Sequence, residues 1–456
     1  MPSSHRRPLE DGTASDDLCY IPRAAMAKTT NILWKAVAFC VLSATTSGAQ
    51  SLRIVTFQTN GTVAWSGAFP GGVCTIEGAT TPRDPWLPLQ SVFTTNAAGA
   101  SRVTPGPQTD QAFYRLLARD LSPTAEGFTN LCASYGILRT VAGTGQFSVD
   151  GYNGWDPEFE NGPATAAELS RPHMAMADDA GDIYIADKDG QAIRKINPAG
   201  VIQTVAGTNL SGDDGNSPGP GTQRRLSSPN GLWVRGDGTL YILDLGNSKI
   251  RRLDTNGVLT TVFHVNDGID IGRGLWVKDD ESLIYFASGT ALRKRTPDGG
   301  IKTVASGFEE LGNLVVDAAG TLVVTDRGAN RVYKVSKGGD KTPIAGNGDL
   351  TGGGDGWPAL STGLAGVRGV WFLPNGGYLL ATHEGSQIWY VDTTGIIHLF
   401  VDGSPGVHWG DGDYFHTPGP KVSEVRAVTV DSRGRIIITE NDSGFIRTID
   451  LLPMFP

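Results

Sequence analysis

The sequence predicts an all-β protein whose larger part is a six-bladed β-propeller, preceded by a small β-sandwich-like domain. A unit of four short strand segments separated by tight turns recurs along the chain, and its last copy stops before the fourth segment. A segment with the pattern of the missing strand stands ahead of the first copy, at Ile137–Gly143. Because completing the last blade from both ends of the chain leaves no open sheet edge, we expect these two segments to pair.

The clearest copy of the unit spans residues 229–262. Its strand segments are Pro229–Val234, Leu240–Asp244, Ile250–Asp254 and Val258–Val262. The turns between them contain Asp-Gly, Gly-Asn and Asn-Gly pairs, which are strong hairpin signals when they separate aliphatic and β-branched runs. Four strands in such a meander make one propeller blade.

The remaining copies set the number of blades. Whole copies of the unit also span residues 173–207, 273–306, 312–346 and 368–403, and an incomplete sixth copy spans residues 426–450. Five whole units and one unit split between the two ends predict six blades. Tryptophan recurs at one position of the first strand, which indicates packing inside the propeller, at Trp233, Trp276 and Trp371.

The unit resembles the NHL repeat. The resemblance is carried by Pro229–Gly231, Leu240–Asp244, Ile250–Arg252 and the Thr-Val-Ala-Gly endings at 140–143 and 204–207. It covers roughly residues 137–452, although Ala287 and Thr382 stand where the pattern has Asp. The resemblance implies a propeller that most often serves as a binding platform. The family also includes an amidating lyase, and it has sugar-lactone hydrolases as structural relatives.

The chain ahead of the propeller divides into three parts. Residues 1–49 are an N-terminal extension and a signal peptide, because the short apolar stretch Asn31–Ala44 is followed by the small residues Ser47–Ala49. Met26 is an alternative start of translation. Residues 50–118 alternate in the manner of short strands and form the β-sandwich-like domain, and residues 119–136 are a linker to the propeller at 137–456.

Composition and the signal peptide point to an exported protein, secreted or periplasmic. The formal net charge is −9, and no long basic stripe is present, so nucleic acid is not an expected partner. No stretch after residue 50 is apolar for long enough to span a membrane, so no stable span is expected in the mature chain. Removal of the signal peptide leaves Cys74 and Cys132, which either form a disulfide or remain as two buried thiols.

The repeat alignment predicts two rings of side chains at one face of the propeller. The first-strand ring, at the start of each first strand, consists of His173, Asn230, Arg273, Gly312, Arg368 and Arg426. The second-strand ring, at the end of each second strand, consists of Asp187, Asp244, Ala287, Asp326, Thr382 and Glu440.

The first-strand ring is the candidate ligand site, formed by Arg273, Arg368, Arg426, His173 and Asn230. Guanidinium groups at corresponding positions around one channel mouth suit a carboxylate, sulfate or phosphate group. The alternative is that these arginines pair with the neighbouring acids of the second-strand ring and close the channel. An Asp before a tight turn commonly caps that turn, so the second-strand ring has a structural interpretation as well.

Two functions follow. The leading hypothesis is a binding or scaffold protein that presents this face to a protein, peptide or anionic carbohydrate and needs no cofactor. The competing hypothesis is a metal-dependent hydrolase or lyase, similar to a lactonase, with Asp244 and Asp326 as metal ligands beside His173 and Asn230. Ca²⁺ is the metal considered, and the acidic, Gly-rich loops at 211–216 and 410–413 could hold it weakly. The residues leave catalysis open.

Overall fold

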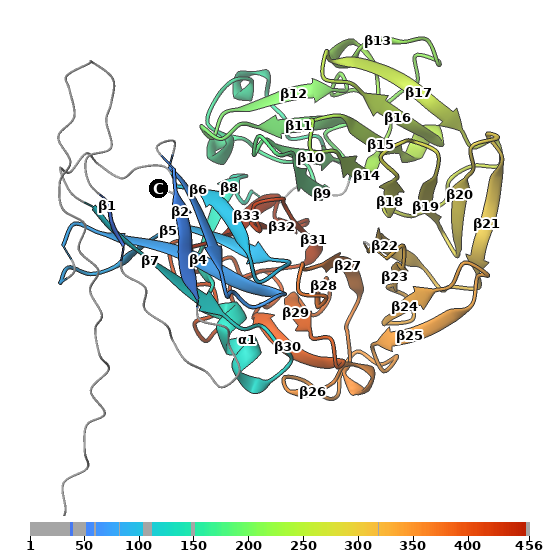
Figure 1. Ribbon diagram of the computed structural model, residues 1–456. Coiled ribbons are helices and arrows are strands. Elements are labelled where there is room, and N and C mark those ends of the chain that lie inside the picture. Colours follow the sequence, from blue (N-terminus) through green and yellow to red (C-terminus); the bar gives the residue numbers. More distant parts are fainter. Residues whose placement is uncertain are drawn as a thin grey trace, which may run out of the picture. The chain divides into compact units, whose positions relative to one another are not determined.

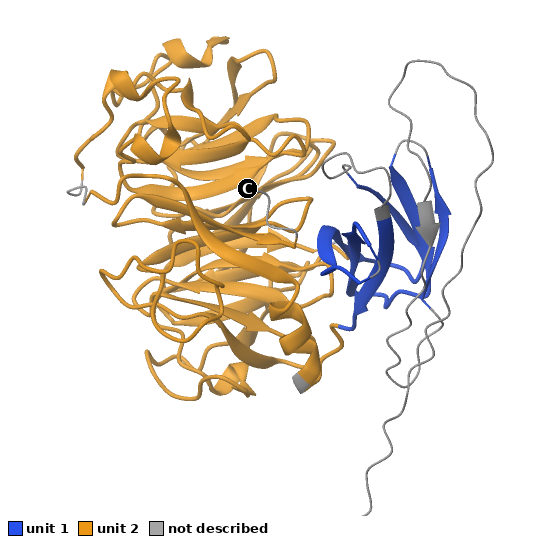
Figure 2. Cartoon of the chain, turned by 90° about the vertical axis from the view of Figure 1, so that its left-hand side faces the viewer, with its two compact units in different colours: residues 1–120 blue, residues 121–456 orange. Residues whose placement is uncertain are grey.

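The computed structural model describes residues 37–39, 52–58, 61–81, 83–103, 112–146, 151–317 and 319–452. The chain forms two compact units, residues 1–120 and residues 121–456 (Figure 2). Of the predicted N-terminal extension and signal peptide, only Val37–Phe39 is described, as strand β1. The rest of that prediction lies outside the described residues. Each unit is considered by itself below.

Unit 1 consists of two small sheets around one core. Strands β1, β7, β4 and β5 form one sheet, and β2, β3 and β6 form the other. Trp65 of β3 and Ile76 of β4 belong to the same buried cluster, so the facing sides of the two sheets share a core. The remaining strands are β2 Arg53–Phe57, β3 Thr62–Ser66, β4 Gly72–Ala79, β5 Leu87–Thr94, β6 Gly99–Arg102 and β7 Ala112–Arg119.

Of the two states that the sequence leaves open for Cys74 and Cys132, the described residues have the free thiols. Both side chains are buried free thiols, and they belong to different units. Cys74 lies on β4 inside the core of unit 1, and Cys132 is the last residue of a helix in unit 2. Burial raises the pKa of each thiol to about 12, so neither is a reactive thiolate at neutral pH.

Unit 2 is a propeller-like assembly of antiparallel sheets, each of four or five strands (Figure 1). The first three sheets contain β9 Pro172–Ala177, β10 Ile183–Asp187, β11 Ala192–Ile196, β12 Ile202–Ala206; β13 Gly219–Pro220, β14 Pro229–Val234, β15 Leu240–Asp244, β16 Lys249–Leu253, β17 Val258–His264; and β18 Leu275–Val277, β19 Ile284–Ser288, β20 Ala291–Arg295, β21 Ile301–Ser306.

The next two sheets and the last sheet complete the described part of unit 2. Their strands are β22 Leu311–Val316, β23 Leu322–Asp326, β24 Arg331–Val335, β25 Lys341–Ala345; β26 Trp357–Pro358, β27 Val367–Phe372, β28 Tyr378–Thr382, β29 Gln387–Val391, β30 Ile396–Val401; and β31 Val425–Val430, β32 Ile436–Glu440, β33 Phe445–Leu451 with β8 Tyr135–Ala142. Short 3-10 turns lie at Pro157–Phe159, Ala164–Ala166, Gly221–Gln223, Leu245–Asn247 and Ala359–Ser361.

The first strands of the sheets lie toward the middle of unit 2 (Figure 1). Strand β9 contacts β14, β14 contacts β18, β18 contacts β22, β22 contacts β27, β27 contacts β31, and β31 contacts β9. These contacts return to their starting strand, so the first strands surround a common axis. Glycines allow neighbouring first strands to lie close together. A Cβ on Gly231, for example, would lie 2.2 Å from the carbonyl oxygen of Arg273.

The last sheet joins the two ends of unit 2, as the sequence predicts. Strand β8 pairs antiparallel with β33, with Leu138 opposite Ile449 and Ala142 opposite Ile446. The other edge of β8 is also bonded, because the Leu138 amide donates to the carbonyl of Asp413 and the Gly412 amide donates to the carbonyl of Leu138. This sheet therefore has no open edge at Leu138.

The segment expected as a linker, 119–136, contains an α-helix instead of only irregular chain. Helix α1 spans Ala125–Cys132, and the side chain of Thr124 caps it by accepting a hydrogen bond from the Gly127 amide. Unit 1 ends at Asp120 and unit 2 begins at Leu121, so α1 is part of unit 2. In the described part of the chain, no helix has the length and apolar character needed to cross a membrane.

Candidate functional site

The first-strand ring is built by β-bulges. Between β14 and β15, Pro229 is opposite Asp244 and Gly231 is opposite Leu243, which leaves Asn230 as the extra residue. The same register shift occurs in β9, β27 and β31. In each of these strands one residue has no opposite residue on the second strand, namely His173, Arg368 and Arg426. A bulge redirects the side chain of its extra residue away from the regular alternation of the strand. The repeated bulge thus places these four side chains at corresponding positions.

His173 and Asn230 form a buried pair. The Nδ1–H of His173 donates to Oδ1 of Asn230, whose Nδ2 donates to the carbonyl oxygen of Gly272, the residue before Arg273. Burial, followed by the positive charges of Arg426 and Arg273, lowers the pKa of His173 well below its usual range. The imidazole of His173 is therefore neutral near pH 7. Its Nε2 atom is a hydrogen-bond acceptor, and none of the described groups donates to it.

Arg273 is a buried cation whose neighbours are mainly cations. It is 2% exposed, and its Nε and Nη1 atoms find no hydrogen-bond partner among the described residues. Burial lowers its pKa well below the usual range, and the charges of Arg426, Arg368 and Arg327 lower it further. We call Arg273, Arg327, Arg368 and Arg426 the arginine cluster.

Two other arginines of the cluster, Arg368 and Arg426, are only partly neutralised. Arg368 donates from Nη2 to Glu384 at 2.7 Å, and Nη2 of Arg426 lies 3.6 Å from Asp442. Both arginines are buried, and the Nε atom of each lacks a hydrogen-bond partner in the described part of the chain. Burial, then the charge of Arg368, lowers the pKa of Arg426 to about 9.

Gly312 is the one glycine of the first-strand ring, and it adds no side chain to the site. A Cβ at Gly312 would lie 2.4 Å from Oγ1 of Thr325 and 2.7 Å from the carbonyl oxygen of Arg368. That hydroxyl donates to the Arg368 carbonyl at 2.9 Å. Glycine is therefore required here so that the backbone of Arg368 can be held close to β23.

Several charged residues of the site escaped the sequence analysis. They follow a second-strand ring residue by one or two positions, in the turn to the third strand, and they are Lys188, Asp189, Arg327, Glu384 and Asp442. The signal that could have identified them is the repeat itself, because the same turn recurs in each unit. The residue types in this turn differ from copy to copy, so these positions do not stand out as the ring positions do.

His383 lies between the two acids that face the cluster. Its Nδ1 is 3.6 Å from Glu384, and its Nε2 is 3.6 Å from Asp442. Although burial opposes ionisation of Asp442, His383 and Arg426 lower the pKa of that carboxyl to about 2. The acids are thus ionised near pH 7, and they face Arg368 and Arg426, whereas Arg273 has no carboxylate of its own in the described residues.

The acids of the second-strand ring are bound within their own sheets. Asp244 accepts hydrogen bonds from the Ser227 amide at 2.8 Å and from Arg251 Nε at 3.0 Å, and Asp326 accepts from two backbone amides at 2.8 and 3.0 Å. Burial raises the pKa of Asp244. Across the described residues, no three His, Cys, Asp or Glu side chains are grouped so that they could hold a metal ion. Asp244 and Asp326 act here as turn anchors.

The acidic loops considered for Ca²⁺ are also paired with the protein. Asp213 accepts from Lys249 at 2.7 Å and from Arg251 at 3.1 Å, and Asp411 accepts from Arg447 at 2.7 Å. These contacts attach each loop to a third strand. We therefore do not assign a Ca²⁺ site to either loop.

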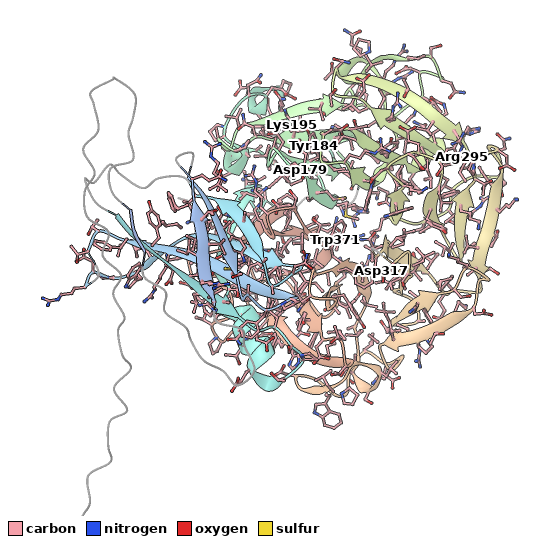
Figure 3. The ribbon with its side chains drawn as sticks, viewed as in Figure 1. Asp179, Tyr184, Lys195, Arg295, Asp317 and Trp371 are labelled. Carbon is pink, nitrogen blue, oxygen red and sulfur yellow. The ribbon has the colours of Figure 1, made fainter. Side chains whose placement is uncertain are left out.

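The three recurring tryptophans meet near the middle of unit 2. The ring of Trp233 lies 6.1 Å from that of Trp276 and 6.1 Å from that of Trp371, although Trp233 and Trp371 belong to sheets that are not neighbours. Figure 3 shows Trp371 near the centre of unit 2. Each tryptophan stands three residues after a first-strand ring position. The axis is thus polar where the arginines lie and aromatic further along the first strands.

Comparisons by sequence identify no family. No family model matches the chain. The protein SUPPRESSOR OF QUENCHING 1, chloroplastic, of Arabidopsis thaliana is 33% identical over 103 residues, which is 22% of this chain. The matching region spans only 9% of that relative's length.

Comparisons by structure show similarity of fold alone. A protein of unknown function from Bacteroides thetaiotaomicron matches with a TM-score of 0.58 and 12% identity, covering 89% of this chain and 100% of its own. Auxiliary nutrient binding proteins from Bacteroides thetaiotaomicron and Bacteroides ovatus match with TM-scores of 0.51 and 0.52, at 13% and 12% identity. Each covers 85% of this chain, and the matches cover 93% and 94% of those proteins. These neighbours are propeller-like, all-β structures.

Proposed function

We propose that this protein is a binding protein that holds an anionic group in the arginine cluster. The observation that carries the proposal is Arg273, which is buried to 2% exposure beside three other arginines and has two nitrogen atoms without a partner. A buried cation without a counter-charge is costly, and the cost falls sharply when a hydrogen-bonding anion is supplied. A carboxylate, sulfate or phosphate group meets this need.

The neutral imidazole of His173 narrows the chemistry expected of the ligand. Because its Nε2 accepts a hydrogen bond and the arginines only donate, a ligand with a hydroxyl next to its anionic group satisfies both. Hydrogen phosphate, hydroxy acids and uronic acids have this combination. The site is almost fully buried, so the anionic group enters the cluster while the remainder of a glycan, peptide or protein stays outside it.

The architecture that we propose for unit 2 is a six-bladed propeller of the NHL type, in a protein that is secreted or periplasmic. The closed series of first-strand contacts and the pairing of β8 with β33 support the blade count. The similarity to auxiliary nutrient binding proteins concerns the fold, and an extracytoplasmic binding role for this chain is in keeping with it. The fold by itself does not indicate a class of ligand, whereas the arginine cluster indicates an anionic one.

Thermal unfolding in the presence of sulfate tests the proposal. We expect sulfate, compared with chloride at equal ionic strength, to raise the Tm of the natural chain, because a ligand at 100 times its Kd stabilises the folded state by about 2.7 kcal/mol. The charge reversals Arg368→Glu and Arg426→Glu and the neutral Arg273→Gln should each reduce this shift to the general stabilising effect of sulfate on folded proteins.

A matched control separates the cluster from charge in general. Arg293→Gln removes an arginine of a third strand that is already paired with Asp267 at 2.9 Å. This variant should keep the full sulfate effect. An equal sulfate shift in Arg273→Gln and Arg293→Gln would show that the anion binds elsewhere, and the proposed site would then be wrong.

A further inference from the structure

A serine, a histidine and a glutamate form a hydrogen-bonded row in the last sheet. His408 Nδ1 lies 2.6 Å from Oε2 of Glu440, and His408 Nε2 is hydrogen-bonded to the hydroxyl of Ser443. The order hydroxyl, imidazole, carboxylate is the arrangement by which a base activates a serine nucleophile while a third group orients the base.

The carboxylate fixes the imidazole in the form that a base requires. Glu440 is fully buried at the end of β32, where it also accepts from the Ser423 amide at 3.1 Å and lies 3.4 Å from Nη1 of Arg447. An ionised carboxylate can only accept, so Nδ1 of His408 carries the proton. The unprotonated Nε2 then faces Ser443 and can take up its hydroxyl proton.

Ser443 is a departure from the repeat. It stands three residues after the second-strand ring residue, in the turn before β33. The same turn position in the other five sheets is occupied by Gly190, Asn247, Thr290, Ala329 and Gly385, of which only Thr290 carries a hydroxyl. In the second sheet, Asn247 donates directly to the ring carboxylate, and no histidine intervenes. A structural turn therefore does not require this serine and histidine.

His408 opens onto a pocket. The pocket has a volume of about 580 Å³, and its wall includes His408, Val407, Trp409, Pro418 and Lys421. Trp409 is 72% exposed, and with the prolines it offers an apolar surface to an acyl group or an aromatic group. Lys421 also lines the pocket, and its Nζ donates to the carbonyl oxygens of Thr417 and Gly419.

We propose that Ser443, His408 and Glu440 form a serine-hydrolase site for small esters with an apolar or aromatic part. Ser443 Oγ attacks the ester carbonyl carbon as its proton passes to His408 Nε2. The acyl–oxygen bond then breaks, and the departing alcohol takes that proton. Water, deprotonated by His408, releases the acid and restores the serine. Asp442, the residue before Ser443 in this turn, faces Arg426 of the arginine cluster.

Covalent labelling tests the proposal on the full chain. We expect an aryl fluorophosphonate to label the natural protein on Ser443, as located by peptide mass spectrometry. Ser443→Ala should not be labelled, and the exposed turn variant Ser336→Ala should be labelled at the natural rate. His408→Gln should slow the labelling by roughly 100-fold to 10,000-fold, as expected for loss of a general base.

Folding and turnover complete the test. Circular dichroism should show that each variant keeps the natural fold, so that lost labelling reports the site. The natural protein should also hydrolyse p-nitrophenyl acetate, and Ser443→Ala should not. Absence of label on Ser443 in the folded natural protein, or equal labelling of His408→Gln, would overturn the proposal.

Discussion

Single residues of the arginine cluster differ in how they are neutralised, and this difference decides where an anion binds. Arg368 has Glu384 at 2.7 Å and Arg426 has Asp442 at 3.6 Å, whereas Arg273 has no such partner in the described residues. Two arginines thus pair with acids of the turns and not with acids of the second-strand ring. An anion gains most from Arg273, because the folded protein leaves that charge uncompensated.

The pKa of Arg426 predicts how anion binding depends on pH. Its folded-state pKa is about 9, far below that of an exposed arginine, so the folded protein loses this proton before the unfolded chain does. Between about pH 9 and pH 12 the anion-free protein should therefore become more stable as pH rises. Anion binding needs the protonated form, so affinity should fall about tenfold per unit above pH 9.

Calorimetric titration with sulfate from pH 7 to about pH 10.5 measures this dependence, because the charge of sulfate does not change across the range. Buffers without multivalent anions are needed. A sulfate affinity that stays constant from pH 8 to 10.5 would contradict the role given to Arg426.

At the scale of elements, the bulged first strands and the strand β8 carry the site. The bulges aim His173, Asn230, Arg368 and Arg426, and the closed contacts of the first strands hold them together. Strand β8 secures the last of these sheets, because it is bonded to β33 on one edge and to the chain around Gly412 on the other. Loosening β8 should therefore weaken the whole ring.

Leu138→Ala tests the contribution of β8. Leu138 is fully buried on this strand, so we expect the variant to lower the free energy of unfolding by about 2–5 kcal/mol. Leu350→Ala is the matched control, because Leu350 is 60% exposed and its truncation should change stability by less than about 0.5 kcal/mol. Urea denaturation of both variants gives the comparison, and a similar small effect in the two would argue against closure through β8.

Helix α1 shows where element prediction from the sequence ends. The repeat made the strands predictable, because each copy supports the interpretation of the others. Helix α1 occurs once, spans only Ala125–Cys132 and contains Gly127, a poor helix former. Its cap, Thr124, follows a proline and resembles many loop positions. Tertiary packing, which a single sequence does not display, decides such a short helix.

At the scale of the whole molecule, the sequence predicted the propeller-like architecture and the first-strand ring of the site. The ring residues were found because they recur at one strand position, whereas Lys188, Arg327 and Asp442 were missed because their turns vary in sequence. The free thiols of Cys74 and Cys132 were undecidable from a count of two cysteines, since pairing depends on distance in the fold. His408 was missed for the same reason, as it comes from a loop far in sequence from Glu440.

The central claim is that the arginine cluster holds an anion, and anomalous diffraction from crystals grown in sodium bromide tests it most directly. Bromide scatters anomalously and accepts hydrogen bonds from guanidinium groups. We predict an anomalous peak within hydrogen-bonding distance of Arg273, on the side that faces Arg426. Bromide peaks confined to the surface, with the Arg273 guanidinium bonded only to groups of the protein, would contradict the account.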